Sequence, residues 1–279
     1  METYVITVFV ICEEVLRMLQ IKDDQQTLMS NAEVMTFAIV AAKYFSSNYK
    51  TARYFCKKLR LFSRILSNSR MNRRIHKIPW ICWNAIFRLL AFIFKQTSKD
   101  KDFAVDSFPV ASCQKNRIDK RKIFLEKCYL GYAASKKRYF CGIKVHMVVT
   151  SEGKPVEVQF TPGSESDVSV LWQMELDIPI DSNLYADGAY NCFELEDVLQ
   201  DEQIKLLAKR GSLAKNRVRE PLKEKMISSR RQIIETAFSS ITSLFPRTFK
   251  VRTESGFLIK VLCSILAYSA SFLCSGLLV

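Results

Sequence analysis

The chain has 279 residues, with 42 Lys or Arg against 28 Asp or Glu, so its formal net charge at pH 7 is +14. This length predicts two structural units, and the positive charge predicts a polyanionic partner, either nucleic acid or an anionic membrane surface. Nine cysteines without a Cys-x-x-Cys pair, together with only two histidines, argue against a disulfide framework, a structural zinc site and a histidine base.

The N-terminal third is predicted to be helical and basic. Apolar periodicity predicts helices over residues 4–20, 32–46, 50–60 and 69–97, and Ser30 and Glu33 have the spacing of a capping box. The segment from Val34 to Lys99 contains no Asp or Glu, and its cations alternate with aromatic residues at helical intervals. We therefore expect residues 1–99 to form a helical domain with a folded basic face. If the polyanionic partner is DNA, this is a DNA-binding domain, and the cations expected to contact DNA are Lys57, Lys58, Arg73 and Arg74.

Strand patterns begin after the polar stretch at residues 99–102. Phe103–Val105 is predicted as a short strand that Pro109 ends, and residues 139–150 and 155–161 as a hairpin. Further strands are predicted at 183–186 and 204–208, and helices at 166–174, 192–199, 222–244 and 256–273. Hairpins followed by alternating strands and helices predict an α/β layer fold for residues 100–279.

Three carboxylates are the candidates for chemistry, because the chain has no glycine-rich phosphate loop and no Gly-x-Ser-x-Gly motif. Asp106 follows the first predicted strand, Asp187 follows the strand 183–186 and precedes Gly188, and Glu235 is the only acid between Glu224 and Glu254. Carboxylates from separate elements suit Mg²⁺ or Mn²⁺, and two such ions can clamp the oxygens of a phosphodiester displacement.

Each of these acids also has a structural interpretation. Asp106 and Asp187 could form turns at strand ends, and Glu235 could pair with Arg231 one helical turn away. Asp167 is interpreted as part of a helix N-terminus, and His146 as a core residue with a hydrogen-bond partner.

The segment from Asp106 onward resembles the DDE transposases of bacterial insertion sequences, most closely the 982 family of insertion sequences. The similarity rests on several motifs that occur in the same order: Asp106–Val110, Gly131–Lys137, Tyr139–His146, Thr161–Ser164, Ala186–Tyr190, Ile234–Phe238 and Arg252–Phe257. The chain differs from related signatures at Ser166, Ser228 and Thr242.

This resemblance implies a ribonuclease-H-like core in which Asp106, Asp187 and Glu235 coordinate two Mg²⁺ or Mn²⁺ ions. The implied activity is cleavage of DNA at the element's end and transfer of the freed strand to target DNA. Arg231 would contact a phosphate near the cut. The implied partners are double-stranded DNA, as terminal inverted repeats and target, and a second copy of the chain in a homodimer. Basic residues of the core expected to contact DNA are Lys136, Lys137, Lys209 and Arg210.

Two other functions remain open from the sequence. The chain could be a catalytically inactive, transposase-derived DNA-binding protein. It could also be a membrane protein, since residues 261–279 carry no charge and reach spanning length, although serines interrupt this run and its apolar residues recur as in a core helix. The transposase interpretation predicts no stable membrane partner and a cytoplasmic, nucleoid-associated protein in a bacterium.

Overall fold

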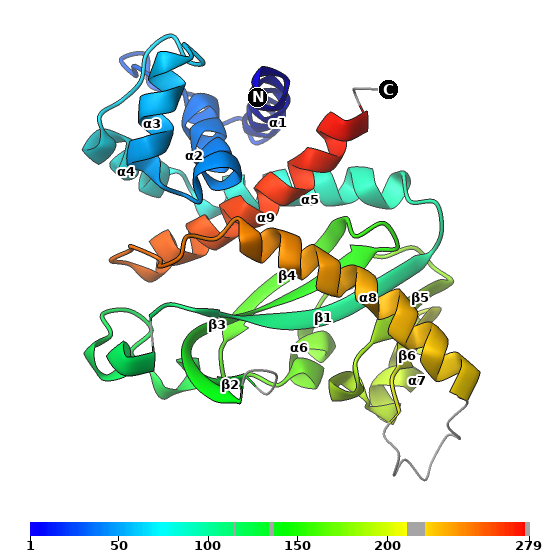
Figure 1. Cartoon of the computed structure of the whole chain (residues 1–279). Helices are drawn as coiled ribbons and strands as arrows, with labels where there is room; N and C mark the ends of the chain where they lie inside the picture. Colours follow the sequence, from blue (N-terminus) through cyan, green and yellow to red (C-terminus); the bar gives the residue numbers. More distant parts are fainter. Residues whose placement is uncertain (114, 134–136, 211–220, 277–279) are drawn as a thin grey trace. The chain divides into compact units, whose positions relative to one another are not determined.

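The computed structural model describes all residues except 114, 134–136, 211–220 and 277–279 (Figure 1). It forms two compact units. The helical unit contains Met1–Leu90 and Ser240–Val279, and the sheet unit contains Ala91–Ser239. The C-terminal forty residues therefore group with the N-terminal helices. The division into domains 1–99 and 100–279 stays a prediction about how the chain folds.

Two largely buried helices from opposite ends of the chain, α2 (Asn31–Phe45) and α9 (Glu254–Gly276), pack together in the helical unit. Its helices are α1 (Glu2–Met18), α2, α3 (Tyr49–Lys58), α4 (Asn68–Lys77), most of α5 (Trp80–Gln96), the end of α8 (Pro221–Ser243) and α9. Helices α1 and α2 both pack against α9. The Tyr4 hydroxyl donates a hydrogen bond of 3.0 Å to the carbonyl of Ala267, and Lys43 donates one of 2.6 Å to Ser271.

The local signals at the start of α2 act as predicted. The backbone N–H of Glu33 donates to the Ser30 hydroxyl at 3.0 Å, and the backbone N–H of Ser30 donates to the Glu33 carboxylate at 2.7 Å. The predicted helix over 69–97, in contrast, is wrong as one helix. It divides at Ile78-Pro79 into α4 and α5, which are bent by 75°, because the residue before a proline is disfavoured in the α-helical conformation.

Helix α9 corresponds to the apolar C-terminal run. Residues Glu254–Cys274 are long and apolar enough to cross a membrane by composition, but most of this stretch is buried inside the protein. The core helix of a protein without membrane segments passes the same test. Burial against α1 and α2 accounts for the hydrophobicity of this helix.

The sheet unit has a six-stranded mixed sheet in the order β2-β3-β1-β5-β6, with β4 on β3 (Figure 1). Its strands are β1 (Asp102–Ala111), β2 (Leu130–Ala133), β3 (Arg138–Thr150), β4 (Pro155–Pro162), β5 (Ser182–Ala186) and β6 (Ile204–Ala208). Strands β1, β2 and β4 pair with β3 in antiparallel fashion, whereas β5 is parallel to β1 and to β6. The unit also contains the helices α6 (Asp167–Gln173) and α7 (Phe193–Asp201), the end of α5 and most of α8. The predicted hairpin is β3–β4, and strand β2 was not predicted.

The first strand is longer than predicted. Pro109 does not end β1, which pairs with β3 as far as Ala111, with Asp106 opposite Met147. The register of β1 with β5 ends at Ala104. Pro109 therefore lies where β1 has no neighbour on the β5 side, and a proline at such an edge removes no hydrogen bond of the ladder. Asp106 lies in the middle of β1, two residues beyond the pairing with β5.

Candidate active site

The three predicted carboxylates reach one region from a strand, a strand end and a helix. Asp106 lies within β1, and Asp187 directly follows β5 as the cap of a short 3-10 turn, Gly188–Tyr190. Glu235 lies on α8, one turn after Arg231. Helix α8 packs on the Asp106 face of β1 through Phe108 and Phe238, whose ring centroids are 4.5 Å apart.

Arg231 lies between these carboxylates. Its Nη2 is 2.9 Å from Asp106 Oδ2 and 3.9 Å from Glu235 Oε1, and its Nη1 is 3.3 Å from Asp187 Oδ1. One guanidinium therefore neutralises part of the charge of all three acids. The structure brings together the three acids predicted for cleavage and the arginine predicted to contact a phosphate near the cut, with the arginine between the acids.

The surroundings of the three acids differ. The side chain of Asp106 is 20% exposed, that of Asp187 46% and that of Glu235 62%. Burial raises the pKa of Asp106 above its ordinary value, although the Ser107 backbone N–H and Arg231 oppose this shift. Arg231 is itself buried, and its Nε has no hydrogen-bond partner. Asp106 is thus the acid that depends most on Arg231 for its charge.

The three carboxylates are chemically suited to bind a hard divalent cation, but they are arranged around the Arg231 guanidinium. Carboxylate oxygens are the ligands that Mg²⁺ and Mn²⁺ prefer, and all three acids lie within reach of one cationic group. Within the described part of the chain, no three acidic, histidine or cysteine side chains are grouped closely enough to hold a metal ion as they stand. As the structure stands, the group that all three acids approach is the Arg231 guanidinium.

Comparison with known proteins identifies the family. Residues 96–246, more than half of the chain, match the family described as "Transposase DDE domain". The chain belongs to this transposase family. No curated protein matches the sequence. Among solved structures, the chain is similar to a piggyBac transposase that was determined by cryo-EM as a synaptic complex with hairpin DNA. The TM-score is 0.56 and the sequence identity is 10%. The match covers 96% of this chain and 72% of the piggyBac chain.

At this identity the structural similarity shows the fold alone. It confirms the predicted architecture, a ribonuclease-H-like α/β core accompanied by N-terminal helices. The family match includes Asp106, Asp187, Arg231 and Glu235. Members of a DDE transposase family cleave and transfer DNA strands with divalent metal ions, so this general activity follows from the match.

A second polar cluster of the transposase lies on the opposite face of β1. Because successive strand residues point to opposite faces, Ser107 points away from α8, and its hydroxyl donates a hydrogen bond of 2.6 Å to Asp167 Oδ1. Lys144 Nζ is 3.4 Å and His146 Nδ1 3.7 Å from the same oxygen. Burial lowers the pKa of His146 to about 4, although the Asp167 carboxylate opposes this shift. His146 is 1% exposed and its Nε2 lies 2.9 Å from the Thr161 hydroxyl, so it is the core residue that the sequence predicted.

Sequence reasoning found only part of this cluster. Asp167 begins α6, as its interpretation as part of a helix N-terminus predicted, and Ser166 caps this helix, since the backbone N–H of Ser169 donates to its hydroxyl at 3.1 Å. The link from Asp167 to Ser107 and Lys144 was missed. A signal existed in the alternation of β3, where Lys144 and His146 are two residues apart and therefore share a face.

The predicted DNA-contacting cations have different surroundings. In the helical unit, Lys57 and Lys58 are exposed in the last turn of α3, and Arg73 is exposed on α4. Arg74 instead donates to Asn31 at 3.1 Å and lies 3.7 Å from Asp23. Its charge is used within the protein.

The predicted DNA-contacting cations of the sheet unit also differ in their exposure and in their contacts. Lys209 is exposed directly after β6, next to the strand that leads to Asp187. Arg210 pairs with Glu196 at 2.6 Å and lies over the ring of Phe193 at 4.9 Å. Lys137 is exposed before β3, and Lys136 lies outside the described residues. Of these four cations, Lys137 and Lys209 are exposed, whereas Arg210 is engaged within the protein.

Proposed function

We propose that this chain binds the ends of a mobile DNA element and catalyses metal-dependent strand cleavage followed by strand transfer. The observation that carries the proposal is the meeting of Asp106, Asp187 and Glu235 around one guanidinium, inside the part of the chain that matches the transposase family. The positive net charge is consistent with a polyanionic substrate.

In this proposal the three carboxylates hold two divalent ions, Mg²⁺ or Mn²⁺. When bound, such ions would activate the attacking oxygen and neutralise charge that develops on the leaving oxygen. The backbone N–H groups of Ser107 and Gly188 each donate 2.7 Å hydrogen bonds to the Oδ1 atoms of Asp106 and Asp187. These bonds hold both carboxylates in orientation. The other oxygen of Asp106, Oδ2, faces Arg231, whereas in Asp187 the bonded Oδ1 is also the oxygen that lies 3.3 Å from Arg231.

Arg231 has two roles in the proposal. Without metal it reduces the repulsion among the acids, and with metal in place its guanidinium is released to contact a phosphate beside the cut. Its geometry suits this second role, because a guanidinium can donate two parallel hydrogen bonds to phosphate oxygens.

The finer identity of the protein also belongs to the proposal. The ordered motifs support a relative of the insertion-sequence 982 family, acting as a homodimer on terminal inverted repeats and target DNA. A cytoplasmic, nucleoid-associated location in a bacterium is part of the same proposal.

A strand-cleavage assay tests the catalytic assignment. The substrate is duplex DNA carrying the inverted repeats that flank the coding gene, incubated with Mn²⁺. We expect Asp106→Asn, Asp187→Asn and Glu235→Gln each to slow nicking and joining by roughly a thousandfold, since metal-assisted stabilisation of the transition state is worth several kcal/mol. DNA binding should persist. Asp201→Asn, at an exposed carboxylate at the end of α7, is the matched control and should retain activity.

The outcomes separate the proposal from its alternative. Normal cleavage by all three variants would show that these acids are not the catalytic ones. Binding without cleavage by the wild type, under any divalent ion, would identify a catalytically inactive DNA-binding derivative.

A further inference from the structure

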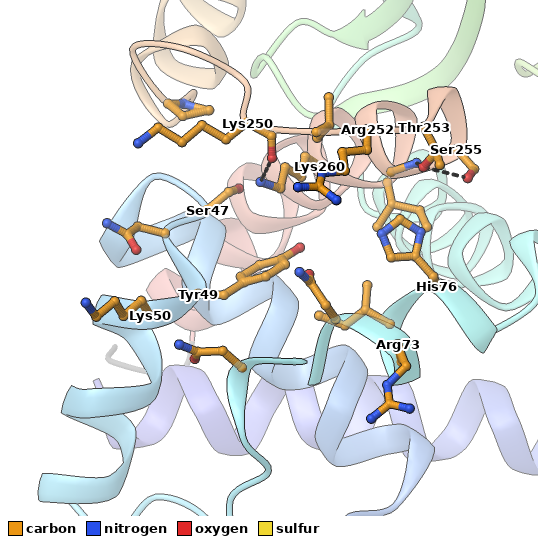
Figure 2. Close-up of a pocket in the computed structure, with 18 of the residues that line it drawn as sticks. Ser47, Tyr49, Lys50, Arg73, His76, Lys250, Arg252, Thr253, Ser255 and Lys260 are labelled. Carbon is orange, nitrogen blue, oxygen red and sulfur yellow. Dashed lines mark hydrogen bonds between the residues drawn. The ribbon is translucent and has the colours of Figure 1, made fainter. Parts of the chain in front are cut away.

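A large basic pocket lies in the helical unit and is separate from the carboxylate site. Its volume is about 1020 Å³, and its walls come from α3, α4, the start of α9 and the segment that precedes α9 (Figure 2). Six cations line it: Lys50, Arg73, Lys77, Lys250, Arg252 and Lys260. None of the side chains lining this pocket is acidic.

The charges of these cations are not balanced within the protein. Across the described residues, none of the ion pairs involves any of the six. Lys50, Lys250 and Arg252 are exposed, so their charges face solvent. Lys260 is more enclosed, and burial lowers the pKa of its ammonium group. It lies 5.2 Å from the ring centroid of Tyr49, and its nearest acceptor is the Lys250 carbonyl at 3.4 Å (Figure 2). An anion in the pocket would meet several cations that have no competing acid.

The backbone around the pocket adds to this preference for anions. Asn48 caps α3 and accepts from the Thr51 backbone N–H at 3.3 Å, so the N-terminus of α3 lies at the pocket wall. Thr253 accepts from the Gly256 backbone N–H at 3.1 Å at the start of α9. Helix N-termini carry partial positive charge and attract phosphate. Amide and hydroxyl side chains of the wall, among them Asn48 and Thr253, can donate hydrogen bonds to phosphate and sugar oxygens.

We infer that this pocket binds the phosphodiester backbone of duplex DNA. The inference rests on the proposed function, because it takes DNA to be the chain's ligand, and it adds a specific contact site to it. Segments that are far apart in sequence build the site together: α3 and α4 on one side, and residues 246–260, which follow the helix of Glu235, on the other. DNA held here is anchored by residues that take no part in strand cleavage.

The test compares two triple variants that lose the same charge. Lys50→Gln/Lys250→Gln/Arg252→Gln removes three exposed pocket cations. Lys22→Gln/Arg64→Gln/Arg88→Gln removes three exposed cations of the same unit that do not line the pocket. Binding of full-length protein to a fluorescein-labelled duplex of mixed sequence is measured by anisotropy over a range of salt concentrations. Circular dichroism confirms that both variants are folded.

We expect the pocket variant to bind more weakly and its plot of log K against log salt to become shallower by roughly 2.7, since each phosphate contact contributes about 0.9 to the slope. The control variant should retain the wild-type slope to within about one contact. The duplex should also protect Lys50, Lys250 and Lys260 from acetylation in the wild type, but not Lys22. Protection by millimolar inorganic phosphate to the same degree would overturn the commitment to DNA.

Equal slopes in the two triple variants would overturn the pocket as a DNA site. That result would leave the catalytic proposal standing, because the carboxylate variants test cleavage separately. A wild-type protein that binds no duplex at all would refute both.

Discussion

Replacing Arg231 with leucine tests whether this side chain holds the carboxylate site together. The variant leaves the Asp106 carboxylate, which is only 20% exposed, without the cation that lies 2.9 Å away. Removing one partner of a buried ion pair costs about 3–5 kcal/mol. The pairs with Asp187 and Glu235 add less than about 1 kcal/mol, because both carboxylates are solvated enough to be screened.

Part of this cost is offset. The buried Arg231 Nε has no hydrogen-bond partner, and removing an unsatisfied donor recovers about 1 kcal/mol or more. The net expected loss is about 2–5 kcal/mol in the free energy of unfolding of the sheet unit. Native-state hydrogen exchange of the β1 and β5 amides measures it locally.

Arg230→Leu is the matched control. Arg230 precedes Arg231 on the same helix, is 44% exposed and lies 3.3 Å from Asp102. Asp102 keeps another partner, since the Asn183 side chain donates to it at 2.9 Å. We expect a loss below about 1 kcal/mol. A double-mutant cycle of Asp106→Asn with Arg231→Leu should give a coupling energy of about 2 kcal/mol. Equal losses in the two leucine variants, or a coupling near zero, would show that the guanidinium does not stabilise the cluster.

Two further predictions concern the sheet unit. The pKa of His146 is lowered from its ordinary 6.5 to about 4 in the folded protein. Between pH 6.5 and 4 the imidazole is therefore protonated in the unfolded chain but neutral in the folded protein, which favours unfolding. The stability that comes from the neutral imidazole is complete above pH 6.5 and is lost as the pH falls toward 4. Acidification from pH 7.5 to 5 should cost about 2 kcal/mol, and His146→Gln should remove most of that dependence in urea titrations; an unchanged dependence would exclude His146 as its source. Gly131→Ala should lower the melting temperature markedly, because the added Cβ would lie 2.1 Å from the Gly163 carbonyl oxygen. Gly188→Ala is the control and should change the melting temperature little, because its Cβ would meet only the Lys209 carbonyl oxygen at 3.4 Å. Equal shifts in the two variants would contradict this packing argument.

Local patterns predicted most elements because each depends on nearby residues. The capping box of α2, the β3–β4 hairpin and strand β6 all follow from short-range signals. The break at Pro79 has such a signal too, and only the strength of the flanking helical periodicity concealed it. Pro109 shows the opposite error. A proline is compatible with a strand where the neighbouring strand has ended, and that depends on the length of β5.

The candidate site required tertiary information at its centre. The spacing of Arg231 and Glu235 on one helix predicted their contact, and the strand-end positions drew attention to Asp106 and Asp187. No sequence spacing relates Arg231 to a strand 125 residues earlier. That contact depends on how α8 packs across β1, through Phe108 and Phe238. The sequence thus predicted the members of the site, while packing decided that the arginine occupies its middle.

The basic residues show why a charge run predicts a ligand class better than it predicts the contacting side chains. Arg74 and Arg210 were both predicted to contact DNA, yet both are engaged by groups of the protein itself. Lys250 and Arg252 were not among the predicted contacts, and they line the pocket that we assign to DNA. Whether a cation is available depends on the acids and carbonyls that the fold places beside it. A loss of DNA affinity that follows pocket residues, and not total charge, would therefore locate binding in the folded surface built by α3, α4 and the segment before α9.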